Sequence, residues 1–257
     1  MQSENIYWYF QNAISKENCN KIIELGEKKI KENLAEGTNT SGTTFGDTHK
    51  KPGLENSLSH ETLQEYSAKT GKHPEEIAKT TYIRDSEIGW LSDQWLYDLI
   101  LPYVEAANKK AGWNYEYDNS ENFQFTTYQK GGFYNWHNDG GSCHYSVFKK
   151  YIPGISPINP ETGEMYQNYT NFLPWVGQVR KLSVTINLNA PGDYEGGNLE
   201  FDHGPHSSQE RYKELTEIKP QGSLVVFPSY VYHRVLPVTK GKRKSLVLWC
   251  IGRPFKW

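Results

Sequence analysis

The hydrophobic period of this chain changes near Asn122, and that change limits the folds it can adopt. From there Phe123 and Phe125 alternate with Gln124 and Thr126, the pattern of a half-buried strand. Further strands are predicted at residues 181–189, 197–201, 222–227, 231–235 and 244–251, separated by turns that contain Pro and Gly. Several short strands with such breaks predict an α+β, mainly β protein with a sandwich or jelly-roll core.

The part of the chain before Asn122 has a mainly helical pattern. Ser15 can cap a helix from Lys16 to about Lys31. A second helix is expected to start near Ser86 and to be kinked or restarted at Pro102. Its apolar stripe would consist of Ile88, Leu91, Trp95 and Leu99. Residues 37–60 have no periodicity and predict a loop, and residues 61–70 a short helix. We therefore expect one domain, 1–257, with a helical support region at 1–120 and the core at 121–257.

Charge and cysteine content restrict the partners of the protein. Lys and Arg total 28 against 30 Asp and Glu, so no overall field would attract nucleic acid or an anionic membrane. The N-terminus lacks the pattern of a signal peptide, and no apolar stretch is long enough to span a bilayer. The 3 cysteines are odd in number and widely spaced, which favours a reducing compartment. We expect a cytoplasmic protein.

Two histidines and one aspartate form a candidate metal site. His137 and Asp139 project to the same side of an extended segment that follows Gly131-Gly132. His233 shares a strand face with Val231 and Val235 and should point inward. Two imidazoles and one carboxylate can bind Fe(II) and leave positions open for further ligands. The alternative for His233 alone is a core histidine that is hydrogen-bonded to a carbonyl.

Arg243 opens a strand whose two faces are both mainly apolar. A guanidinium that enters a buried sheet needs an anion, and the neighbouring strand 223–227 contains no acidic residue. A ligand carboxylate would satisfy Arg243, with Ser245 donating a further hydrogen bond. The alternative is an ion pair with a carboxylate of the fold; Asp193, Glu195 and Asp202 are available for it.

Four ordered blocks of sequence carry a resemblance to a known family. They are Tyr128–Asp139, Leu182–Asn189, Tyr194–Phe201 and Phe227–Leu246. In these blocks, and over roughly 122–254, the chain resembles the iron- and 2-oxoglutarate-dependent dioxygenases, within them the prolyl 4-hydroxylase type of bacteria and phages. Arg84-Asp85-Ser86 and the helix opening at Ser15 resemble that family's N-terminal half as well.

The resemblance implies a double-stranded β-helix of the jelly-roll, cupin-like kind, and it assigns roles to individual residues. His137, Asp139 and His233 would be the iron ligands. Arg243, with Tyr128 and Ser245, would bind the cosubstrate 2-oxoglutarate. The implied reaction hydroxylates a C–H bond, of a peptidyl proline in this family, and releases succinate and CO2. O2 is the second cosubstrate, and ascorbate could serve as reductant.

The substrate contacts are predicted from aromatic residues near the metal site. The substrate is expected to be a peptide or a protein. The aromatic side chains that would contact it are those of Tyr134, Trp136, Trp175 and Trp249. The segment 142–178 is longer than is typical of the family and is rich in aromatic residues, which predicts a lid. Its alternative is a disordered segment or an oligomer contact.

Two other function classes remain open at the level of sequence. One is a catalytically silent jelly-roll binding protein, and the other is a cupin-like metalloenzyme that does not use 2-oxoglutarate. The complete ligand set argues against the first, and Arg243 with Ser245 argues against the second. A further cluster, Asp202 with His203 and His206, lies in a turn, where a solvated loop is favoured over a metal site.

Overall fold

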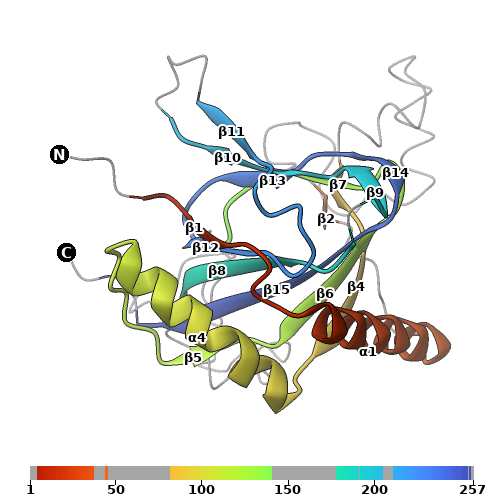
Figure 1. The fold of residues 1–257 in the computed structure, drawn as a ribbon, viewed down its shortest axis with the longest axis horizontal. Helices are drawn as coiled ribbons and strands as arrows, with labels where there is room; N and C mark the ends of the chain where they lie inside the picture. Colours follow the sequence, from red (N-terminus) through yellow and green to blue (C-terminus); the bar gives the residue numbers. More distant parts are fainter. Residues whose placement is uncertain are drawn as a thin grey trace, which may run out of the picture.

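The computed structural model describes residues 5–37, 44–45, 82–140, 178–190, 192–204, 211–253 and 255. Two antiparallel sheets face each other in this part of the chain, and helices cover the outer face of the larger sheet (Figure 1). The larger sheet has the strand order β1 (Trp8–Phe10), β12 (Leu224–Pro228), β8 (Val179–Asn187), β15 (Arg243–Gly252), β6 (Phe123–Tyr128), β4 (Glu87–Leu91), and β5 (Asn119–Ser120) also pairs with β15.

The smaller sheet carries the residues of the candidate metal site. Its order is β11 (Tyr212–Leu215), β10 (Leu199–Asp202), β13 (His233–Val235), β7 (Phe133–His137), β3 (Tyr82–Asp85), β2 (Thr44–Phe45). A separate pair joins β14 (Val238–Gly241) to β9 (Tyr194–Gly196). Strands that are distant in sequence therefore alternate between the two layers, as a jelly roll requires.

The helices pack on one face of the larger sheet and form the main core. They are α1 (Lys16–Ala35) and α4 (Gln94–Lys110). The hydroxyl of Ser15 accepts a hydrogen bond from the backbone N–H of Asn18, so the expected cap is present. Phe123 and Phe125 are completely buried against this helical layer. A second core, with Phe201, Phe227 and Val235, lies on the side of the smaller sheet.

The helix expected from Ser86 is wrong in its first part. Ile88 and Leu91 have helical spacing, but residues 87–91 form strand β4, which pairs with β6 from Glu87↔Thr127 to Leu91↔Phe123. Gly89 explains the strand: a Cβ there would lie 3.2 Å from a side-chain carbon of Ile30, so a bare backbone lets α1 approach closely. The helix begins only at Gln94 and runs through Pro102 without a break.

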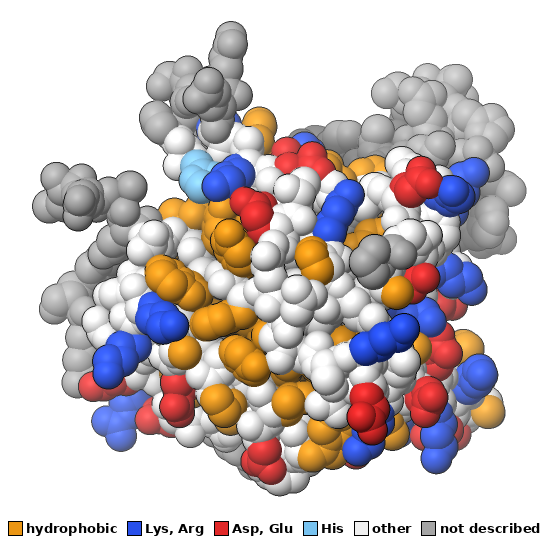
Figure 2. Space-filling model, viewed as in Figure 1, with side chains coloured by type: hydrophobic (Ala, Val, Ile, Leu, Met, Phe, Trp, Pro, Cys, Tyr) orange, Lys and Arg blue, Asp and Glu red, His pale blue; other side chains and the backbone are white. Residues whose placement is uncertain are grey.

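Most of the predicted loop at 37–60 and the helix at 61–70 lie outside the described residues. Within the described part, no helix combines the length and the apolar composition of a membrane span. On the face shown in Figure 2, acidic and basic side chains are interspersed around hydrophobic ones. This mixture agrees with the formal net charge of −2.

Candidate metal centre

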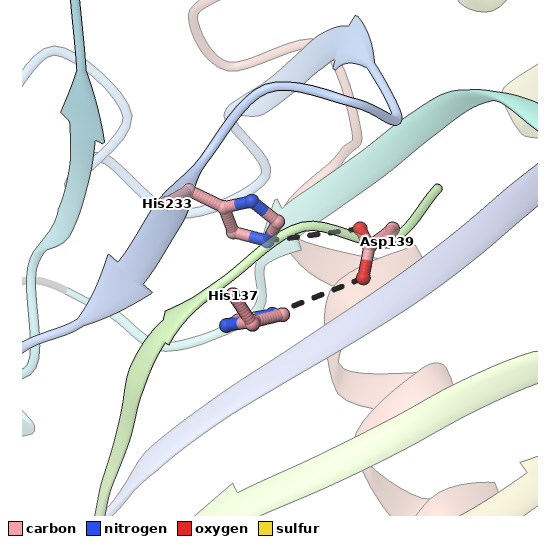
Figure 3. Close-up of side chains that lie close together, drawn as sticks. All are labelled: His137, Asp139 and His233. Atoms are coloured by element: carbon pink, nitrogen blue, oxygen red, sulfur yellow. Dashed lines mark ion pairs between the residues drawn. The ribbon is translucent and has the colours of Figure 1, made fainter. Parts of the chain in front are cut away.

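Strand pairing brings the two histidines together. His137 ends β7 and lies directly opposite His233, the first residue of β13. Asp139 follows in a turn, and all three side chains converge (Figure 3). The Nε2 atoms of His137 and His233 lie 3.8 Å and 3.6 Å from the carboxylate oxygens of Asp139. These distances are too long for hydrogen bonds, so the three ligand atoms surround a gap.

Backbone carbonyls orient both imidazoles toward that gap. The Nδ1 of His137 lies 2.7 Å from the carbonyl of Asn135, and the Nδ1 of His233 lies 3.0 Å from the carbonyl of Val231. A carbonyl only accepts, so each Nδ1 must carry the proton and donate it. Each Nε2 is then free of a proton and offers a lone pair, which is the arrangement of metal-binding histidines.

Two serines and a glycine fix Asp139. Ser183 of β8 donates a hydrogen bond to the carboxylate of Asp139 and lies 2.9 Å, Oγ to Oγ, from Ser229. The backbone N–H of Gly140 donates to the carbonyl of Ser229 at 2.7 Å. Both serine side chains are fully buried. The turn that carries Asp139 is thus tied to the segment that leads into β13.

The protonation states suit metal binding. Burial, together with the neighbouring His233, lowers the pKa of His137 to about 3. Burial alone would raise the pKa of Asp139, but the two imidazoles, Arg180 and the Ser183 hydrogen bond lower it to about 2. Near neutral pH His137 is neutral and Asp139 is ionised.

A β-bulge in β7 places Tyr134 beside the site. His233 pairs with His137 and Val235 with Tyr134, so three steps on β7 face two on β13. In a regular strand, residues three apart point to opposite faces, but the bulge brings Tyr134 and His137 to one face. Their rings stack with centroids 3.5 Å apart. Burial raises the pKa of the Tyr134 hydroxyl to about 12, so Tyr134 stays neutral.

Arg243 lies at the other side of the same cavity and is 2% exposed. Its guanidinium donates to the hydroxyl of Ser245 at 3.1 Å and lies 5.4 Å from the ring centre of Tyr128, its cross-strand partner. None of the carboxylates in the described ranges pairs with it; Glu195 instead pairs with Lys240. The expected need for an external anion therefore stands.

Of the predicted substrate residues, two line this cavity, one lies on another face, and the fourth is outside the described residues. Tyr134 and Trp249 line it together with the metal-site residues. Trp136 is the neighbour of His137 in β7 and points to the opposite, outer face of the smaller sheet, where it stacks on Tyr212 at 4.9 Å and lies under Arg234. Trp175, His206 and nearly all of the predicted lid 142–178 lie outside the described residues. Asp202 forms an ion pair with Arg211.

Sequence patterns alone do not identify two arginines near the site, one buried and one half-buried. Arg84 of β3, 7% exposed, lines the cavity and stacks 4.8 Å above the ring of Tyr134. Arg180 of β8 donates two hydrogen bonds to Glu121, at 2.5 and 2.6 Å, and stacks 3.8 Å from the ring centre of Trp249. In the sequence, Arg84-Asp85-Ser86 only contributes to the resemblance to the family. Its proximity to the site depends on the pairing of β3 with β7, which a local pattern does not reveal.

The donor set fits a divalent transition metal. Within the described ranges, His137, Asp139 and His233 are the group of potential ligands whose donor atoms all lie within 4.8 Å of one another. Two nitrogens and one oxygen on one side of a gap, with the opposite side open to the cavity, match the facial set that binds non-haem Fe(II).

Comparison with known proteins identifies the family. The model of the 2OG-Fe(II) oxygenase superfamily matches residues 123–251, just over half of the chain. The chain belongs to this superfamily, whose cofactors are Fe(II) and 2-oxoglutarate. A PKHD-type hydroxylase of a Picosynechococcus species is 34% identical over 42% of this chain and 42% of its own length. Another, from Thermosynechococcus vestitus, is 43% identical over 35% of this chain and 38% of its own length. The match thus covers less than half of the length of each of these relatives.

Solved structures share the fold over nearly the whole chain. A prolyl-4-hydroxylase of Pseudomonas putida has a TM-score of 0.50 and 15% identity, covering 97% of this chain and 94% of its own. The viral collagen prolyl hydroxylase of Paramecium bursaria Chlorella virus 1 has a TM-score of 0.52 and 17% identity, covering 97% of both chains. These comparisons confirm the predicted double-stranded β-helix fold.

Proposed function

We propose that this protein is an Fe(II)- and 2-oxoglutarate-dependent dioxygenase that hydroxylates a peptidyl proline. The observation that carries the proposal is the pair of sites in one cavity, a three-ligand metal centre and a buried Arg243 without a protein carboxylate. A metal enzyme that does not use a dicarboxylate has no need for a cation at that depth. The hydroxylase names of the relatives support the activity, and the prolyl hydroxylase structures suggest the substrate class.

Each residue has a defined part in this proposal. His137, Asp139 and His233 would hold the iron, with the imidazoles fixed by their backbone carbonyl partners. Arg243 and Ser245 would bind the far carboxylate of 2-oxoglutarate, and the hydroxyl of Tyr128 would donate a third hydrogen bond. When bound, iron and 2-oxoglutarate supply the oxidising power: O2 is split between the substrate and succinate, and CO2 is released.

The surrounding aromatic side chains would exclude water from the metal site and hold the imidazoles in their orientation. Tyr134 covers one face of His137, and Phe227 contacts His233 at a centroid distance of 4.7 Å. A peptide substrate would enter on the side of the cavity that Trp249 lines. Trp249 lies toward the C-terminal end of β15, and Arg243 is the first residue of that strand. Ascorbate would serve only to return oxidised iron to Fe(II).

An anaerobic titration with Fe(II) and 2-oxoglutarate tests the proposal, read by the weak visible charge-transfer band of the chelate. The wild type should show the band. Arg243→Ala should need on the order of 100-fold more 2-oxoglutarate, because a buried charge partner is lost. Arg243→Lys should lie between the two, and Lys240→Ala, an exposed residue paired with Glu195, should match the wild type.

Absence of a band in the wild type would contradict the proposal. Admission of O2 with a proline-containing peptide then tests the chemistry, because succinate should form in step with hydroxylated peptide. A band without any succinate would indicate a protein that binds both molecules but does not catalyse the reaction.

A further inference from the structure

Arg84 is a second buried cation in the same cavity, and its hydrogen bonds go only to neutral groups. Its Nε donates to Ser86 at 2.8 Å, and its Nη2 lies 2.7 Å from the amide oxygen of Gln124 and 3.3 Å from the hydroxyl of Thr126. In the part of the chain that the structure describes, no carboxylate pairs with Arg84. A buried guanidinium without an anion is costly, which indicates that something else supplies the charge.

Counted over the residues that the structure describes, the charge of the cavity with both cofactors bound would be unbalanced by one. Arg180 and Glu121 neutralise each other, and Asp139 offsets one of the two remaining arginines. Fe(II) and 2-oxoglutarate carry equal and opposite charges, so loading the proposed cofactors leaves the balance unchanged. One positive charge then remains, and Arg243 is already assigned to 2-oxoglutarate. The uncompensated cation is therefore Arg84.

Two tryptophans lie near the hydrogen-bond partner of Arg84. Gln124, its hydrogen-bond partner, pairs with Trp90 on one side and with Val247 on the other. Trp90 is 40% exposed, and its ring centre lies 6.2 Å from that of Trp249. Trp249 is 6% exposed, and its indole N–H has no hydrogen-bond partner. A second donor thus lines the same cavity without an acceptor.

We infer that the substrate presents a carboxylate to Arg84. This inference rests on the proposed function and narrows its substrate class. The hydroxylated residue would carry a free carboxylate as the C-terminal residue of a peptide, or would lie beside an Asp or Glu in a peptide. In both cases the anion would bind the guanidinium in a two-point contact, and the aromatic rings of Trp90 and Trp249 would flank the ligand.

Two pairs of probes, measured by anaerobic titration calorimetry on protein loaded with Fe(II) and 2-oxoglutarate, test the inference. N-acetyl-L-proline against N-acetyl-L-prolinamide tests a terminal carboxylate. Acetyl-prolyl-glutamate amide against its glutamine analogue tests a side-chain carboxylate. In at least one pair the wild type should bind the acid ten or more times as tightly as the neutral partner. Arg84→Gln should reduce that ratio to within twofold, and Arg84→Lys should retain part of it.

Three results would overturn the inference. The first is equal binding of acid and neutral partner in both pairs, including no binding of any probe. The second is an acid preference that persists in Arg84→Gln. The third is a charge-transfer band that needs as much extra 2-oxoglutarate in Arg84→Gln as in Arg243→Ala, since Arg84 would then belong to the cosubstrate.

Failure of the proposed function has a different signature. The wild-type band is recorded before any probe is added, and its absence contradicts the dioxygenase proposal alone. The probe pairs are then titrated into protein without metal, where an acid preference that Arg84→Gln removes would still support a carboxylate site. Thermal unfolding of each variant, compared with the wild type, identifies any loss of binding that comes from misfolding.

Discussion

Residues outside the proposed set of metal ligands orient the carboxylate of Asp139 and so affect how well it can bind a metal. Its carboxylate accepts a hydrogen bond from Ser183, which contacts Ser229, and the carbonyl of Ser229 holds the N–H of Gly140. Such outer partners orient the ligand and keep it ionised. Two buried hydroxyls in contact also satisfy each other, so neither pays the cost of an unpaired polar group.

Ser183→Ala should weaken metal binding by about 10- to 100-fold, the usual effect of losing an outer partner of a ligand. The cause is that the carboxylate of Asp139 loses one donor and some of its fixed orientation. Titration with Mn(II) or Co(II), followed by calorimetry, measures the affinity directly. Ser183→Thr keeps the hydroxyl and should stay near the wild type; equal weakening in both variants would point to packing instead.

Residue patterns in the sequence identified much of this site but not all of it. The alternation at 123–128 correctly separated Phe123 and Phe125, which face the helices, from Gln124 and Thr126, which face the cavity. Arg84 was missed because β3 approaches the site only through its pairing with β7. Pairing between strands distant in sequence leaves no local periodic signal.

At the scale of elements, irregular positions aim the side chains of the site. The bulge in β7 brings Tyr134 to the same face as His137, although strict alternation would place residues three apart on opposite faces. The turn after β9 acts similarly on Arg243. Gly197 has φ of +61°, and a Cβ there would lie 2.9 Å from the Cδ of Arg243. Both devices combine local backbone geometry with a distant partner, so local sequence patterns do not specify them.

Gly197→Ala should displace Arg243 and raise the 2-oxoglutarate concentration needed for the charge-transfer band, by on the order of tenfold. It should also destabilise the fold by about 1–3 kcal/mol, because a positive φ strains any residue with a Cβ. Gly192→Ala is the matched control. Its φ is +93°, but a Cβ there meets nothing within 4 Å, so it should show the strain without the change in 2-oxoglutarate binding.

At the scale of the whole molecule, the ligand cluster opposes folding at acid pH. The pKa of His137 is about 3 in the folded protein against an ordinary value of 6.5. Between these values the unfolded chain binds a proton that the folded protein does not, so lowering the pH favours unfolding. Asp139, at about 2 against 3.8, adds its own loss only below about pH 4.

Without metal, the free energy of unfolding should therefore fall as the pH drops from about 6.5 to 4.5, by up to about 2–3 kcal/mol from His137 alone. Urea unfolding at a series of pH values in the presence of a chelator measures the slope. His137→Gln should show a shallower slope over the same window. An unchanged slope in that variant would assign the acid sensitivity to other groups.

The direct pairing of His137 with His233 makes the proposed iron site depend on the register of the two strands. A slip of one residue between β7 and β13 would preserve a sheet, yet it would turn one imidazole to the outer surface. A metal ion bound by residues of both strands would stabilise the correct register against such a slip. Metal binding would thus favour the correctly assembled smaller sheet, since only strands in the correct register could bind the ion.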